Sequence, residues 1–262
     1  MNRPGQGATQ TEVVARLRAA GCVFAEDEAA LLLAQAGTAA DLDASVARRV
    51  AGEPLEVILG WAEFCGLRIG VRPGVFVPRQ RTQLLVQEAA RLLEPGAVVL
   101  DLCCGTGAVG RVLATRVPGL ELYAADSEPA AVRCARDNLA GFGEVFAGDL
   151  FAPLPSTLRG RLTVLTCNAP YVPTDAIDLM PPEARLHEPL VALDGGHDGL
   201  DVQRRVAAEA PSWLVPGGHL LVEAGESQAD ESCRIFAGHG LTARVVTSAD
   251  LNATVVVATR PA

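Results

Sequence analysis

The sequence contains no lysine, so all 22 of its basic residues are arginine. This absence excludes Schiff-base chemistry, the lysine of a Walker-type phosphate loop and a lysine general base. Acidic residues outnumber basic ones by 31 to 22, which gives a net charge of −9. Because neutralisation of phosphates supplies most of the affinity for nucleic acids, this balance weighs against a general nucleic-acid binder.

Long apolar runs and paired cysteines are also missing. No stretch of about 18 uninterrupted apolar residues is present, and the first ten residues lack the apolar core of a signal peptide. The seven cysteines are scattered and form no Cys-x-x-Cys pair, and the four histidines are isolated. This pattern argues against a disulfide framework and predicts no bound metal. We therefore expect a protein of the reducing cytoplasm with no membrane partner.

The chain is long enough for one large domain with a small accessory domain. Its 262 residues are 49% hydrophobic and 20% charged, which is typical of globular proteins. Residues 1 to about 10 are expected to form a frayed tail. Apolar residues then recur at spacings of three and four up to residue 50, which predicts two or three helices. Residues 1–52 are thus predicted to form an N-terminal helical domain.

A β-hairpin linker is expected over residues 53–77, where β-rich runs are interrupted by Gly66 and by Pro73-Gly74. Residues 78–262 then form the third predicted unit, in which strands and helices alternate after a helix at 82–93. Strands are expected at 97–102, 120–126, 144–149, 162–168 and 217–225, helices at 107–117, 128–139, 201–214 and 228–238, and further extended runs at 241–247 and 253–260. Such alternation predicts an α/β fold, with a mostly parallel, seven-stranded sheet covered by helices on both faces.

The segment DLCCGTGAVG (101–110) follows the first of these strands and opens a helix. Gly105 and Gly107 permit a tight turn and close approach of a ligand to the backbone. The carboxylate of Asp101 suits a cationic ligand better than a pyrophosphate. S-adenosylmethionine carries a sulfonium and an ammonium group, so its charge fits this position.

Two further acidic residues are predicted at the ends of neighbouring strands. Asp126 can accept both ribose hydroxyls of a nucleoside, and Asp149 can accept from an adenine amino group. Since the carboxyl ends of parallel strands share one edge, the three acids predict a nucleoside site. The alternative is that Asp101 and Asp126 cap the helices that follow them.

Asn168-Ala169-Pro170-Tyr171 comes at the end of the fourth strand. The side-chain carbonyl of Asn168 and the main-chain carbonyl of Ala169 are two acceptors that can hold both hydrogens of a planar NH2 group. Pro170 makes this segment rigid, and Tyr171 can stack on a planar amide or base. The alternative is an ordinary Asn-x-Pro turn.

Together, the D-L-x-x-G-T-G and N-x-P-Y motifs resemble class I S-adenosylmethionine-dependent N-methyltransferases. More narrowly, the chain resembles the protein-(glutamine-N5) methyltransferases that modify peptide chain release factors. This likeness extends from about Gly52 to the C-terminus and rests on residues 52–79, 101–108, 168–171, 188–201 and 216–228. It implies a Rossmann-like class I methyltransferase fold, S-adenosylmethionine as cofactor and a release factor as protein partner. The acceptor would be the glutamine of a Gly-Gly-Gln loop, and the N-terminal helices would dock the substrate.

The resemblance also implies roles for individual residues. The catalytic residues would be Asn168, Ala169, Pro170 and Tyr171. With Asp101, the cofactor would be bound by Arg79, Thr82, Cys103, Cys104, Gly105, Thr106, Gly107, Asp126, Asp149, Leu150 and Asn168. Five positions depart from the family pattern. Ala169 replaces a proline and Cys103 replaces a glycine. In Gln80-Arg81-Thr82-Gln83, which stands where the family has proline, an acid, threonine and glutamate, only Thr82 is retained.

Other functions remain open at this point. One is methylation of N6 of adenine in nucleic acid, against which the net charge of −9 and the upstream hairpin both weigh. A second is N-methylation of a small-molecule amide or amine. A third is a cofactor-binding scaffold without catalysis, against which the intact Asn168 and Tyr171 argue.

Overall fold

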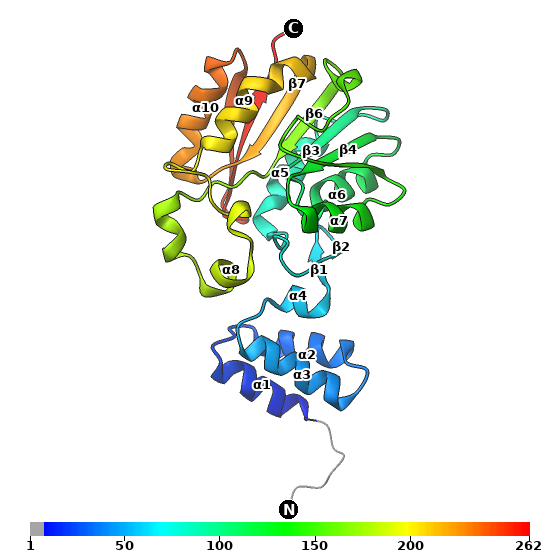
Figure 1. Ribbon diagram of the computed structural model, residues 1–262, viewed down its shortest axis with the longest axis vertical. Coiled ribbons are helices and arrows are strands. Elements are labelled where there is room, and N and C mark those ends of the chain that lie inside the picture. Colours follow the sequence, from blue (N-terminus) through cyan, green and yellow to red (C-terminus); the bar gives the residue numbers. More distant parts are fainter. Residues whose placement is uncertain (1–7) are drawn as a thin grey trace, which may run out of the picture.

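The computed structural model describes residues 8–262, so most of the tail expected over residues 1 to about 10 lies outside the described part (Figure 1). The helices are α1 (Gln10–Ala19), α2 (Ala25–Gln35), α3 (Ala39–Val50), α4 (Leu55–Leu59), α5 (Gln83–Ala90), α6 (Ala108–Arg116), α7 (Pro129–Asn138), α8 (Pro182–His187), α9 (Asp201–Trp213) and α10 (Ala229–Gly238). The strands are β1 (Trp61–Phe64), β2 (Leu67–Gly70), β3 (Val98–Leu102), β4 (Glu121–Asp126), β5 (Gly143–Ala147), β6 (Leu162–Cys167), β7 (Leu214–Glu223), β8 (Thr242–Ser248) and β9 (Ala253–Thr259).

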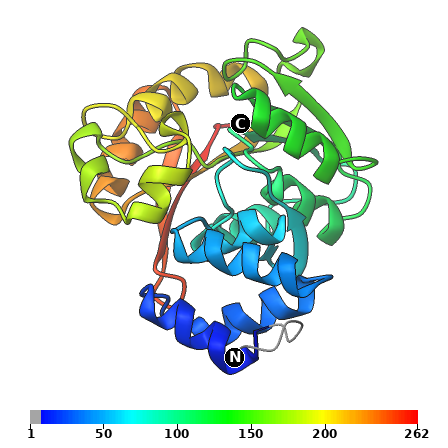
Figure 2. The ribbon, with the colours of Figure 1, turned by 60° about the horizontal axis from the view of Figure 1, so that its bottom comes forward.

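The expected N-terminal helices are present as α1, α2 and α3, which form a block at one end of the molecule (Figures 1 and 2). Helix α1 begins with a capping box, in which Thr9 and Glu12 each accept from the other's main-chain N–H. Leu17, Leu32 and Val46 come from three different helices and meet in a small apolar core of their own. The three-to-four-residue spacing of apolar residues therefore reflects one buried face per helix.

Residues 55–59 were expected to belong to a β-rich stretch, and this prediction is wrong because they form helix α4. Pro54 sits at the N-cap of α4, Leu59 packs into the N-terminal core, and Gly60 ends the helix in a left-handed conformation with φ 76°. The predicted hairpin follows as β1 and β2, joined by Cys65 and Gly66 with φ values of 53° and 81°. Two successive positive φ values are typical of the tight turns that connect antiparallel strands.

The large sheet has the strand order β5-β4-β3-β6-β7-β9-β8, and β9 runs opposite to the other six strands. Helices α5, α6 and α7 contact one face, and α9 and α10 contact the other (Figure 1). Along β3, Leu100 and Leu102 enter the core under α9, whereas Val99 enters the core under α5 and α6. Burial on both faces explains why this strand is apolar along almost its whole length. The predicted seven-stranded, mostly parallel sheet is confirmed.

The order of the strands also predicts where a ligand binds. β3 connects through α6 to β4 on one side, while the adjacent β6 connects through residues 168–200 and α9 to β7 on the other side. At such a switch point the two connections diverge and leave a crevice beyond the carboxyl ends of the strands. The glycine-rich turn follows β3 and Asn168 follows β6, so the fold brings both predicted motifs to this crevice.

Candidate active site

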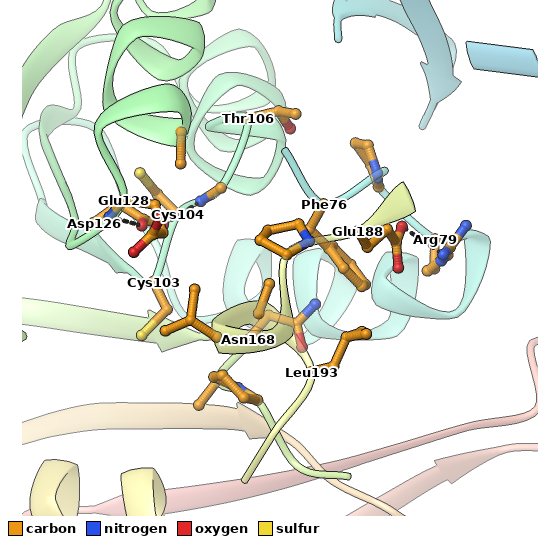
Figure 3. Close-up of a pocket in the computed structure, with 18 of the residues that line it drawn as sticks. Phe76, Arg79, Cys103, Cys104, Thr106, Asp126, Glu128, Asn168, Glu188 and Leu193 are labelled. Carbon is orange, nitrogen blue, oxygen red and sulfur yellow. Dashed lines mark hydrogen bonds and ion pairs between the residues drawn. The ribbon is translucent and has the colours of Figure 1, made fainter. Parts of the chain in front are cut away.

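A cavity of about 630 Å³ lies at the carboxyl ends of β3, β4 and β6. Its walls contain every predicted site residue except Gly107. Figure 3 shows Asp126 and Glu128 on one side, Arg79 and Glu188 on the other, and Asn168 between them. The volume is within the range of roughly 300–1,000 Å³ that is typical of small-molecule sites.

The glycine-rich turn holds its shape through left-handed backbone conformations. Cys103, Gly105 and Gly107 have φ values of 55°, 55° and 74°. At Gly107, an added Cβ would come within 3.1 Å of the Leu139 side chain. Gly107 is therefore needed for close packing at the start of α6, which explains why it does not line the cavity. Cys103 occupies a left-handed position without the conformational freedom of glycine.

Asp101 is 2% exposed and accepts two hydrogen bonds. One comes from the main chain of Gly110 at 3.0 Å and the other from the Thr166 hydroxyl at 3.1 Å. Gly110 is the third residue of α6, so this is the helix-capping contact considered as the alternative. Burial raises the pKa of Asp101 to about 7. Its predicted contact with a cationic cofactor stays a prediction.

Asp126 ties the end of β4 to the glycine-rich turn. Its two carboxylate oxygens accept from the main-chain N–H groups of Gly105 and Glu128, at 2.8 and 2.9 Å. Burial raises the pKa of this carboxyl group. Each carboxylate oxygen can accept a second hydrogen bond, so the side chain is still able to bind a hydroxyl pair in the cavity.

Asp149 was expected to end the third strand, but β5 ends two residues earlier at Ala147. Gly148 turns the chain there, with φ 156°, and its N–H donates to the main chain of Asp126. Asp149 follows in a loop and pairs with Arg205 at 2.5 Å. It lines the cavity beside Leu150, so the side chain reaches the expected site by a different local structure.

Asn168 is the first residue after β6, and its Nδ2 donates to the Thr82 hydroxyl at 3.4 Å. Within residues 8–262, no hydrogen bond occupies Asn168 Oδ1 or the main-chain oxygen of Ala169. Both residues line the cavity. The two acceptors predicted for a planar NH2 group are therefore available.

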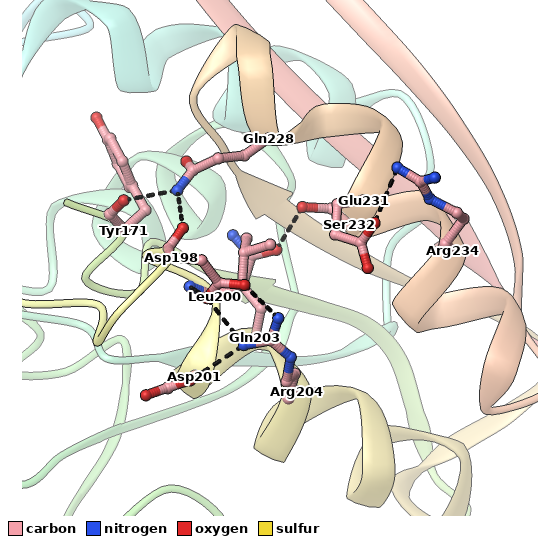
Figure 4. A network of polar contacts seen from close by, with 10 residues as sticks. All are labelled: Tyr171, Asp198, Leu200, Asp201, Gln203, Arg204, Gln228, Glu231, Ser232 and Arg234. Carbon is pink, nitrogen blue, oxygen red and sulfur yellow. Dashed lines mark hydrogen bonds and ion pairs between the residues drawn. The ribbon is translucent and has the colours of Figure 1, made fainter. Parts of the chain in front are cut away.

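Hydrogen bonds hold both the side-chain hydroxyl and the main-chain oxygen of Tyr171. Its hydroxyl donates to Glu223 at 3.2 Å, and burial raises the pKa of the phenol to about 12. Its main-chain oxygen accepts from Gln228 at 2.9 Å, and the same amide nitrogen donates to the main chain of Asp198 at 2.9 Å (Figure 4). Gly199 must lack a side chain because an added Cβ would come within 2.2 Å of the Tyr171 oxygen. The tetrapeptide loop is thus held by Glu223 at the end of β7 and by Gln228 at the start of α10, which also ties it to the segment that precedes α9.

Several residues of the site were not predicted. Glu188 accepts from the main chain of Val77 at 3.2 Å and from Arg79 at 2.6 Å, and it joins two walls of the cavity. Glu223 ends the apolar strand β7 and is 2% exposed. A carboxylate at the end of an apolar strand was the available signal for Glu223. Phe76 also lines the cavity, but no local pattern indicated it.

The sequence predicts neither a bound metal nor a membrane-spanning segment. Within residues 8–262, no group of three or more histidine, cysteine or acidic side chains is arranged to hold a metal ion. The helices of the same residues are all too short or too polar to span a bilayer. The absence of a bound metal stays a prediction.

Comparison with known proteins places these motifs in a family. Residues 66–180 match the family model described as "Methyltransferase small domain". A release factor glutamine methyltransferase of Geobacter sulfurreducens is 40% identical over 74% of this chain and 69% of its own. One from Agrobacterium fabrum is 32% identical over 92% of this chain and 93% of its own.

A solved structure, a methyltransferase from Pyrococcus furiosus, covers 76% of this chain and 91% of its own with a TM-score of 0.58. At 15% identity, this likeness concerns the fold alone. The sequence relatives carry the assignment, since one of them aligns with 92% of this chain. The chain belongs to the release factor glutamine methyltransferase family.

Proposed function

We propose that this chain transfers a methyl group from S-adenosylmethionine to the side-chain amide nitrogen of a glutamine in a peptide chain release factor. Membership of the family supports the reaction and the acceptor. The observation that carries the proposal is the pair of free acceptors, Asn168 Oδ1 and Ala169 O, in the same cavity as the glycine-rich turn.

The residues of the cavity fit S-adenosylmethionine. Asp126, Asp149 and Leu150 line the cavity. Asp126 would accept the ribose hydroxyls, and Asp149 and Leu150 would lie beside the adenine. The turn from Cys103 to Gly107 lets the ligand approach the main chain closely. When bound, this cofactor would supply a methyl group on a positively charged sulfur, and a carboxylate such as that of Asp126 would favour that charge.

The protein's contribution to the chemistry is mainly positioning. An amide nitrogen is a weak nucleophile because its lone pair is delocalised into the carbonyl. Two hydrogen bonds from the NH2 group, one to Asn168 Oδ1 and one to Ala169 O, would hold the nitrogen in line with the methyl group. The cofactor would supply the methyl group, and the amide nitrogen, held by Asn168 Oδ1 and Ala169 O, would give up one proton to solvent as it is methylated. Tyr171, held by Glu223, would form the wall beside the planar amide.

A protein acceptor is favoured by the surface near the cavity. Leu179, Leu186, Leu190 and Val191 lie between β6 and α9 and are 85%, 69%, 59% and 49% exposed. Val191 also lines the cavity. Several exposed apolar side chains in one segment are typical of a protein-contact surface.

All seven cysteines are free thiols, which accords with the reducing cytoplasm expected from the sequence.

The test is mass spectrometry of a release factor after incubation with the protein and S-adenosylmethionine. One added methyl group on the glutamine of the Gly-Gly-Gln peptide is the expected result. Asn168→Ala is the matched control and should slow methylation by about a hundredfold or more while it retains cofactor binding. An unmethylated release factor, with cofactor bound to the wild-type protein, would contradict the acceptor. Methylated adenine in ribosomal RNA or DNA, assayed in parallel, would favour the alternative function.

A further inference from the structure

The wall of the cavity contains a buried acceptor, Glu188 Oε2, that no group of residues 8–262 satisfies. Four buried side-chain atoms of this part of the chain have no hydrogen-bond partner: Glu188 Oε2, Gln203 Nε2, Trp213 Nε1 and Glu223 Oε2. Among these four residues, Glu188 alone lines the cavity of the candidate active site. A carboxylate oxygen that has lost its hydration without gaining a partner costs free energy. A ligand that donates a hydrogen bond to Glu188 Oε2 from the cavity would offset this cost.

The rest of Glu188 is held firmly. Its Oε1 accepts from the main-chain N–H of Val77 at 3.2 Å and from Arg79 at 2.6 Å. Its own main-chain N–H donates to Ala184 at 3.0 Å where α8 ends, and Pro189 follows. Burial raises the pKa of Glu188, whereas the charge of Arg79 and the hydrogen bonds from Val77 and Arg79 act in the opposite direction. Since both donors use Oε1, the lone pairs of Oε2 stay unused in a fixed position.

Glu188 lies on the side of the cavity away from the proposed ribose site. Figure 3 shows it across from Asp126, with Asn168 between them. A cofactor with its ribose at Asp126 and its methyl group directed at Asn168 would leave the space beside Glu188 to the acceptor substrate. Leu186 and Leu190, two positions before and after Glu188, are 69% and 59% exposed and belong to the segment that favours a protein acceptor. Both observations place Glu188 on the substrate side.

The donor that fits this position is a main-chain N–H group of the substrate. In a Gly-Gly-Gln sequence, the glutamine NH2 group would be taken by Asn168 and Ala169, and the glycines have no side chains. Main-chain N–H groups are therefore the donors that remain in this sequence. They would lose their water on entering the cavity and would need an acceptor there. A carboxylate is a strong acceptor, because hydrogen bonds to ionised groups are stronger than those between neutral groups.

We propose that Glu188 Oε2 binds a main-chain N–H of the substrate peptide, at the target glutamine or at a residue next to it. This inference rests on the function proposed above and adds a subsite for the peptide main chain. The contact would favour glutamine within a chain over a small-molecule amide or amine, since the small molecule has no main chain. Glu188 would therefore contribute to substrate specificity, and Arg79 would act through it by holding Oε1.

Glu188→Gln tests the subsite with almost no change in shape. Val77 and Arg79 are both donors, so the new amide would turn its oxygen to them and present its NH2 group in place of the free acceptor. We expect the Michaelis constant for the intact release factor to rise about tenfold or more, with kcat changed less, because the contact would form before methyl transfer and persist through it. The dissociation constant for S-adenosylmethionine should stay within twofold.

Asp178→Asn is the matched control. It removes a carboxylate from the same segment, but this side chain is 92% exposed and water can replace its contacts. Its kinetic constants should stay within twofold of the wild type, and thermal melting checks that both variants are folded. A rise in the Michaelis constant as large as that of Glu188→Gln would show that loss of negative charge alone is responsible, which would contradict the subsite.

A second measurement uses the wild-type protein with altered peptides. A fluorescent Gly-Gly-Gln peptide is compared with four copies, each N-methylated at one main-chain nitrogen: either glycine, the glutamine or the following residue. Dissociation constants are measured in the presence of S-adenosylhomocysteine. At least one copy should bind the wild-type protein about tenfold more weakly than the parent peptide. The same copy and the parent should bind Glu188→Gln equally, because the variant has already lost the contact.

The possible outcomes separate this subsite from the proposed function. Equal affinities of all five peptides for the wild-type protein, or an unchanged Michaelis constant in Glu188→Gln, would overturn the subsite and leave the function intact. A weaker affinity for S-adenosylmethionine with unchanged peptide affinity would also overturn it and would place Glu188 at the amino group of the cofactor. Glu188-dependent peptide binding without methylation of a release factor would support the subsite, whereas the proposed function would fail.

Discussion

Replacing Asp101 by asparagine should change the pH dependence of stability in a defined direction. Asp101 is 2% exposed, and burial raises its pKa from the ordinary value of 3.8 to about 7. A carboxyl group whose pKa is higher in the folded chain than in the unfolded chain stabilises the folded state at pH values where the group is protonated in both. That contribution is fully present below about pH 4 and is lost as the pH rises towards 7, since the unfolded chain ionises first. The difference in pKa corresponds to roughly 4 kcal/mol, as an order of magnitude.

Asparagine cannot ionise, so Asp101→Asn should avoid this loss. Its side chain can accept from Gly110 and turn its NH2 group towards Thr166, whose hydroxyl can accept in return. The free energy of unfolding of the variant, relative to the wild type, should therefore increase with pH between about 4 and 7 by an amount on the order of 4 kcal/mol.

Urea denaturation of the cofactor-free proteins at several pH values measures this difference. Asp194→Asn is the control with the opposite sign, because hydrogen bonds from Gly196 and Thr174 lower the pKa of the exposed Asp194. Its carboxylate contributes stability above its unfolded pKa and loses it as the pH falls, so the asparagine variant should be the less stable protein at neutral pH. A difference between wild type and Asp101→Asn that is the same at pH 4 and pH 8 would refute the view that Asp101 is a buried, proton-retaining group.

Three further predictions concern the cofactor, the substrate and the N-terminal helices. Asp126→Ala should raise the Michaelis constant for S-adenosylmethionine about tenfold, as expected for lost hydrogen bonds to a charged group, and an unchanged value in steady-state assays would remove Asp126 from the ribose site. Leu186→Ser should raise the Michaelis constant for an intact release factor but not the cofactor affinity, and equal substrate kinetics would show that this exposed leucine makes no contact. Glu28→Ala should destabilise the N-terminal helices by roughly 3–5 kcal/mol, because it leaves the largely buried side chain of Arg49 without its main partner. Hydrogen exchange of α1 to α3 would measure this loss, and unaltered protection would contradict it.

The sequence predicted the parts of the fold that depend on local patterns. The alternation of strands and helices was sufficient for the sheet, because each apolar run was bounded by turn residues. Residues 55–59 were misread since short runs containing Val57 and Ile58 suit either a strand or a buried helix. Their helical form depends on the N-terminal core, which receives Leu59.

The same distinction applies to the site: its local motifs could be predicted, whereas the contacts between residues distant in the sequence could not. The glycine-rich turn and the Asn168–Tyr171 tetrapeptide are contiguous in the sequence, so their chemistry could be predicted from neighbouring residues. The contact between Arg79 and Glu188 joins residues 109 positions apart, and that between Tyr171 and Glu223 joins residues 52 apart. Such contacts exist only after folding, and a single sequence contains no local signal for them.

The thiols of the glycine-rich turn are potential acceptors of the methyl group that the cavity is proposed to handle. A methyl group on a sulfonium is an alkylating reagent, and a thiolate is the most reactive nucleophile that a side chain offers. A hydrogen bond with Cys167 and burial raise the pKa of Cys103, and burial raises that of Cys104. Both thiols therefore keep their protons at neutral pH and are weak competitors for the methyl group. The cavity wall can therefore contain both cysteines without becoming a substrate for the methyl donor that it would bind.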